Sequence, residues 1–136
     1  MVSGATIVDL GPNGGATYQF TVLNTDAIEK GTVCILTDPR TASGAVITTS
    51  GGAVAGIAAS EKVASDGATT IGCHTEGIFD IYASAGLAIA AGDYVVLSGS
   101  NTIQGAEKVK GDGAFGQALE ASASATAETI LVRLTL

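Results

Sequence analysis

Glycine, serine and threonine interrupt this chain roughly every eight to twelve residues, and this punctuation limits its fold more than any other feature. The 136 residues include 19 glycines, and turn-forming pairs such as Asp38-Pro39 and Asp66-Gly67 separate short runs rich in Val, Ile and Thr. β-Branched residues favour strands, and many short strands in succession are typical of sandwiches and barrels. The sequence therefore predicts an all-β protein, a small barrel or sandwich of short antiparallel strands. The expected strands are residues 17–23, 32–36, 45–48, 53–58, 70–82, 94–97, 102–104, 114–120 and 129–135.

Two stretches of the chain resemble each other. The segment IEKGTVCIL at 28–36 aligns with IAAGDYVVL at 89–97, which places Gly31 and Gly92 at equivalent positions with a spacing of 61 residues. Further along, GIAAS at 56–60 aligns with GQALE at 116–120. This pattern predicts two similar β-units packed into one barrel or sandwich. The alternative is that a chain rich in Gly, Ala and Val aligns with itself by chance.

The first 15 residues differ from the rest. They end in the breaker cluster GPNGG at 11–15, which indicates an N-terminal arm at 1–15 set off from a β-rich domain at 16–136. An extended arm of this kind can add a strand to the open sheet edge of a neighbour. The alternative is that residues 5–10 form a first edge strand of the same domain.

Charge and hydropathy exclude several classes of partner. The net charge is −7 and the six basic residues are scattered, whereas nucleic-acid binding needs clustered Lys and Arg. No stretch approaches the ~20 apolar residues of a membrane helix, and residues 1–15 lack the pattern of a signal peptide. We therefore expect no nucleic-acid or membrane partner, and a soluble chain made in a cytoplasm. The two cysteines, Cys34 and Cys73, are expected to be buried free thiols.

The sequence offers little catalytic chemistry. His74 is the only histidine, and Cys73 and Glu76 are its nearest candidate co-ligands, too few for a zinc site. With one histidine and no Gly-x-Ser-x-Gly turn, a nucleophile with an adjacent base is not expected. Glu76 and Asp80 are expected on the same face of one strand, where solvated carboxylates are the usual interpretation. We predict no catalytic residues, no metal site and no cofactor.

The order of these motifs resembles a family of small phage proteins that decorate capsids, some of them described only as a domain of unknown function. The residues that carry the resemblance are Ile28–Leu36, Val54–Ala58, Gly77–Ile81, Ile89–Val95, Phe115–Ala121 and Ile130–Leu134. It covers about 27–136, and the longer stretch at 1–25 departs from the family pattern.

The resemblance implies a structural virion protein that binds the outside of an icosahedral capsid and stabilises it. It implies the major capsid protein as partner, a homotrimer as the assembly and no enzymatic activity. On this interpretation the arm contacts the capsid through its apolar residues, which are Val2, Ile7, Val8 and Leu10. The alternatives left open are a fibre, spike or tail component, and a β-module that binds a carbohydrate or another small ligand.

Overall fold

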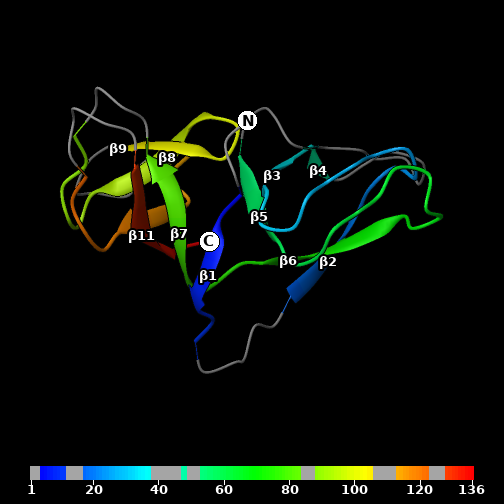
Figure 1. Ribbon diagram of the computed structural model, residues 1–136, viewed down its shortest axis with the longest axis horizontal. Helices are drawn as coiled ribbons and strands as arrows, with labels where there is room; N and C mark the ends of the chain where they lie inside the picture. The colour runs from blue at the N-terminus through cyan, green and yellow to red at the C-terminus, as the bar shows by residue number, and fades with distance from the viewer. Residues whose placement is uncertain are drawn as a thin grey trace.

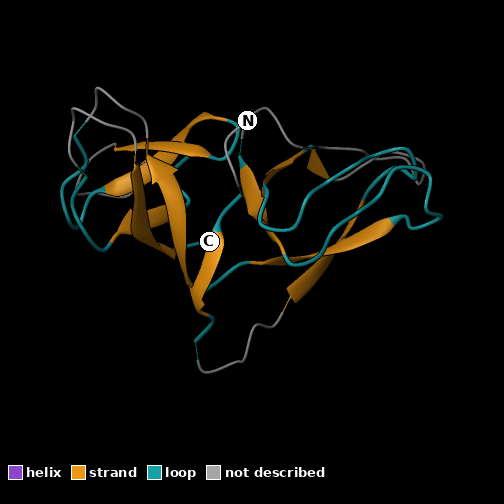
Figure 2. Cartoon of the chain, in the orientation of Figure 1, coloured by secondary structure: helices purple, strands orange, loops and turns teal. Residues whose placement is uncertain are grey.

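The computed structural model describes residues 4–11, 17–37, 47–48, 53–83, 88–105, 113–122 and 128–136. Every regular element among them is a β-strand, as Figure 2 shows, so the all-β prediction is confirmed. The strands are β1 (Thr6–Asp9), β2 (Thr17–Thr21), β3 (Val33–Leu36), β4 (Ile47–Thr48), β5 (Val54–Ala58), β6 (Thr70–His74), β7 (Ile78–Ala83), β8 (Tyr94–Gly99), β9 (Thr102–Gly105), β10 (Gly116–Ala118) and β11 (Glu128–Leu134).

The strands form two sheets that lie side by side (Figure 1). One has the order β2-β6-β5-β3-β4, and every pairing in it is antiparallel. The other has the order β1-β7-β11-β10-β8-β9, and a parallel pairing of β9 with the end of β7 closes five of its strands into a ring. We call the five strands β2–β6 the first unit and the five strands β7–β11 the second unit.

The two units are repeats of one design, as the alignment of the two segments predicts. If β2–β6 are matched in order with β7–β11, the strand orders of the two sheets are identical apart from the additional strand β1. The equivalent glycines, Gly31 and Gly92, both have positive φ, and each donates its N–H at 2.8 Å, to the carbonyls of Ala58 and Ala118 respectively. Outside the strands, the bridge between Ile28 and Lys62 recurs between Ile89 and Ser122.

The interiors of the two units differ in how well they are filled. The second unit encloses Phe79, Phe115 and nine smaller buried residues in one apolar cluster, which also takes in Val33, Ile35, Val54 and Ile57 of the first unit. At positions equivalent to Phe79 and Phe115, the first unit has Tyr18, which is 65% exposed, and Ala55. Its own cluster consists of Val22, Ile28, Cys34, Ala55, Ala58, Ile71 and Cys73, with Phe20 packed against it. The second unit therefore buries the larger core.

One expected strand is wrong. The alternation of apolar residues predicts a single strand at 70–82, but the chain breaks between β6 and β7 at Gly77, where φ is +122°. A Cβ at Gly77 would lie 2.9 Å from the carbonyl oxygen of Asp9, so the turn requires glycine for close approach as well as for its φ. Glu76 consequently lies before β7 and shares no strand with Asp80.

Candidate functional site: the N-terminal strand and its groove

The N-terminal strand β1 lies at the edge of the second unit, where it pairs antiparallel with β7. All four of its side chains are exposed, although two of them are Ile and Val. Thr6 lies opposite Asp80 and Ile7 opposite Phe79, and the register then shifts so that Asp9 lies opposite Ile78. Val8 is therefore the extra residue of a β-bulge, and such residues often re-aim a side chain.

The start of β1 is fastened to the first unit by its backbone. The N–H of Ala5 donates to the carbonyl of Gly31 at 2.7 Å. The two backbones cross so closely that a Cβ on Gly4 would lie 2.6 Å from the carbonyl carbon of Gly31, and a Cβ on Gly31 would lie 2.5 Å from the oxygen of Ala5. Glycine at 31 thus allows both the positive φ of its turn and the contact that ties β1 to both units.

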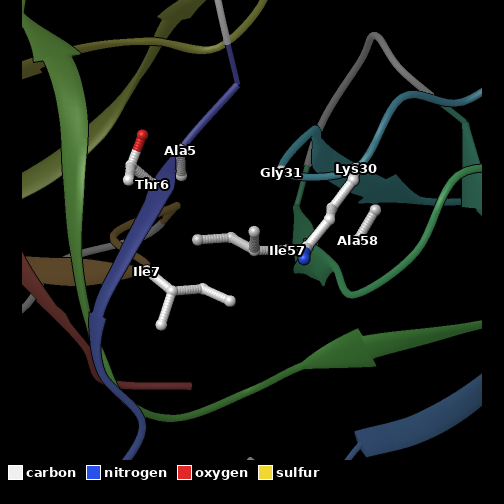
Figure 3. Close-up of a pocket in the computed structure, with 7 residues that line it drawn as sticks. All are labelled: Ala5, Thr6, Ile7, Lys30, Gly31, Ile57 and Ala58. Carbon is white, nitrogen blue, oxygen red and sulfur yellow. The ribbon is translucent and has the colours of Figure 1, made fainter.

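A groove of about 300 Å³ separates β1 from the first unit. Ala5, Thr6 and Ile7 line it from β1, and Lys30, Gly31, Ile57 and Ala58 line it from the opposite side. Figure 3 shows the side chains of Ile7 and Ile57 directed into the same space, with Lys30 reaching toward it. The groove is thus mainly apolar, with one ammonium group among its lining residues.

The four arm residues fall into different environments. Ile7 is 38% exposed and faces the groove, whereas the bulge residue Val8 is 50% exposed. Leu10 is half-buried and packs against the larger apolar cluster, so it anchors the end of β1. Val2 lies outside the described residues. Sequence reasoning did not find the opposite wall of the groove, because its residues come from a distant part of the chain.

The single histidine is buried and lies against an aromatic ring. His74 packs on Phe79 with a ring-centroid distance of 5.8 Å, and its Nδ1 atom has no hydrogen-bond partner within the described part of the chain. Burial lowers the pKa of His74 below its ordinary value, and the positive charge of Lys30 lowers it further. Among the described residues no group of three or more His, Cys, Asp or Glu is placed to hold a metal ion.

The two cysteines meet inside the first unit. Cys34 on β3 and Cys73 on β6 are free, fully buried thiols, and β5 runs between their strands. Gly56 on β5 packs closely against β6, because a Cβ there would lie 2.5 Å from the carbonyl oxygen of His74 and 3.1 Å from the Cβ of Cys73. The hydrogen bond with Cys73 and burial both raise the pKa of the Cys34 thiol, so it stays protonated at neutral pH.

Lys62, one of the six basic residues, is buried with 3% of its surface exposed. Its Nζ donates to the carbonyls of Asn24 and Val63 at 2.9 and 2.8 Å and forms an ion pair with Asp66 at 2.7 Å. This lysine joins the loop after β2 to the loop after β5. It therefore holds these loops together and does not present a free charge to a partner.

Comparison with known proteins identifies the family of the chain. A family model described as phage cement protein matches residues 13–134, and its match begins earlier than the region of resemblance at about 27–136. No curated protein and no solved structure matches. None of the described residues forms a helix able to span a membrane. Phage cement proteins are structural proteins that bind the capsid surface of the virion and stabilise the head, which favours head decoration over the fibre, tail and carbohydrate-binding alternatives. The chain belongs to the phage cement protein family.

Proposed function

We propose that this cement protein contacts the capsid through its N-terminal arm, and that of its four apolar residues Val2 and Val8 touch the shell, whereas Leu10 anchors the arm and Ile7 lines the groove beside it. The observation that carries this proposal is the exposure of all four side chains of β1. A central Ile-Val pair in a strand is normally covered, and an exposed apolar strand at a sheet edge is a common site of protein contact.

The position of β1 in the family comparison supports this proposal. The family model begins at residue 13, so β1 lies outside the part of the chain that the model matches. The four exposed side chains of β1 add little to the buried core. The strand β1 contributes few buried side chains and lies outside residues 13–134, which the family model matches. It is therefore suited to recognise the capsid of one particular phage.

Within β1, Val8 is the best candidate for a residue that contacts the capsid. As the bulge residue it has no partner in β7, and half of its surface is accessible. Leu10 packs against the core and would hold the strand in place. Ile7 faces the groove, so it serves an occupant of that groove.

We further propose that three copies form a closed ring and that the protein performs no catalysis. A ring of identical chains on a symmetric lattice multiplies weak contacts into strong total binding. The buried position of His74, the only histidine, supports a structural function, because a general base must reach its substrate.

Binding of purified protein to shells of the phage's own major capsid protein tests the proposed contact. Val8→Asp should weaken binding at least tenfold, because it places a charge in an apolar contact. Val63→Asp is the matched control, since Val63 is 54% exposed and lies in the loop between β5 and β6. Binding by the Val8 variant that equals wild type would reject the contact, and failure of wild type to bind shells would reject the assignment to this partner.

A further inference from the structure

Three strands of the protein have an edge with no partner strand among the described residues, namely β1, β2 and the two-residue strand β4. β1 pairs with β7 on one side only, and β2 pairs with β6 on one side only. Soluble proteins usually protect open edges with Lys, Pro or a bulge. β2 has the sequence TYQFT, its register with β6 is regular, and it carries none of these protections. An unprotected edge of this kind predicts a partner strand.

The internal repeat indicates which strand suits the open edge of β2. In the repeat, β2 is equivalent to β7, and Tyr18 is equivalent to Phe79. In the second unit it is β1 that pairs with β7, and Ile7 lies directly opposite Phe79. Within this chain, β1 therefore already pairs with β7, which is the repeat equivalent of β2.

The groove beside β1 offers space for the exposed side chain of Tyr18 on β2. Tyr18 is the most exposed large hydrophobic residue of the described chain, at 65%. The groove of about 300 Å³ opens next to Ile7, with Ile57 on its other wall. Aromatic side chains are favoured anchors at protein interfaces because their rings fill apolar pockets while the hydroxyl stays hydrogen-bonded. Lys30, among the lining residues, supplies a donor for the phenol oxygen.

We propose that copies of this chain associate through β1 and β2, with the open edge of β2 of one copy paired to the open edge of β1 of the next. Tyr18 enters the groove of the neighbouring copy between Ile7 and Ile57. The two patches differ, so the contact is heterologous and repeats around a ring. Only the number of copies in that ring rests on the trimer proposed above. Val8, as the bulge residue, is not needed for this pairing and remains available to the shell.

Disulfide trapping between separate chains tests the pairing directly. One chain carries Ile7→Cys and the other carries Tyr18→Cys, and the native thiols do not interfere because both are fully buried. Mixed chains should form a cross-linked heterodimer on mild oxidation. The control mixture replaces Tyr18→Cys with Val63→Cys. Equal cross-linking in the two mixtures would overturn the proposal.

The oligomeric state of variants provides a second test. Wild type should sediment as an oligomer, Tyr18→Lys and Ile7→Lys as monomers, and Tyr18→Phe as an oligomer, because the ring is the anchor. Wild type that stays monomeric, or Tyr18→Lys that stays oligomeric, would reject the contact. These outcomes are separate from shell binding, since a monomer that binds shells contradicts this inference and the proposed ring of three copies but leaves the proposed capsid contact intact.

Discussion

Asn101 accepts a hydrogen bond at 2.8 Å from the backbone N–H of Val33, which lies 68 residues earlier in the chain. Asn101 lies in the turn between β8 and β9 with φ of +55°, a conformation that Asn tolerates better than most residues. Val33 begins β3, so this bond joins the tip of a hairpin in the second unit to the first unit. Along with the shared apolar cluster, it fixes the two units relative to each other.

Removal of the Asn101 side chain should weaken this junction. Asn101→Gly keeps the positive φ accessible but leaves the N–H of Val33 without its acceptor, and we expect a loss of about 1–3 kcal/mol in the free energy of unfolding. Asn101→Ala should cost more, because it adds backbone strain. Urea unfolding measures both. An Asn101→Gly protein as stable as wild type would show that the bond contributes nothing.

Gly31→Ala should destabilise the attachment of β1 far more than Gly11→Ala. Both glycines have positive φ, so each substitution introduces strain of about 1–2 kcal/mol. Only at Gly31 does the new Cβ meet backbone, 2.5 Å from the oxygen of Ala5, whereas nothing lies within 4 Å of a Cβ at Gly11. Hydrogen exchange of the Ala5 amide, which donates to Gly31, should accelerate in the Gly31 variant alone. Equal exchange in the two variants would contradict the close crossing.

Lys62→Met should destabilise the protein by about 1–3 kcal/mol, because it leaves the carbonyls of Asn24 and Val63 without the ammonium group that donates to them. The pKa of Asp66 is lowered chiefly by its hydrogen bond from Lys62. The stabilisation from Asp66 is therefore present above its ordinary pKa of 3.8 and is lost as pH falls through its lower pKa in the folded state. Acid unfolding followed by circular dichroism should show this loss in wild type. In the Lys62→Met protein this component of the acid transition should be smaller but still present, because the N–H groups of Val63 and Ala68 still donate to Asp66.

His74 should make the protein less stable in mild acid. Because its folded-state pKa is lowered, the unfolded chain binds the proton more readily, so stability falls as pH drops below the ordinary value of 6.5. The fall stops once pH passes below the folded-state pKa. His74→Leu should remove this dependence and leave stability at pH 8 similar to wild type, since Nδ1 has no partner to lose among the described residues. Urea midpoints at pH 8 and pH 5 compare the two proteins.

Much of the strand content follows from local sequence, and the exceptions have identifiable causes. Val54–Ala58 and Thr102–Gly105 are strands within a residue of their predicted bounds, because β-branched runs between turn residues fix them locally. The repeat was visible because Gly31 and Gly92 share a turn that needs positive φ. The break at Gly77 was missed because the apolar alternation continues on both sides of it.

The groove was beyond prediction for a different reason. Ile7 and Ile57 come from strands in different sheets, and no local pattern states that β1 would pair with β7 or start against Gly31. The burial of Lys62 was missed in the same way, since its acceptors lie in two loops far apart in sequence. Local rules specify strands and turns, whereas the meeting of distant strands depends on the packing of the whole chain.

The unequal interiors of the two repeats imply a division of roles during folding and assembly. We expect the second unit, which is closed into a ring around Phe79 and Phe115 and contributes most of the larger apolar cluster, to form before the first unit during folding. The first unit has Ala55 and the exposed Tyr18 at those positions, and we expect a partner to cover the apolar surface that Tyr18 leaves accessible. In a duplicated protein of this kind, the second unit can provide stability while the first unit adjusts its contacts to the curvature of the capsid lattice.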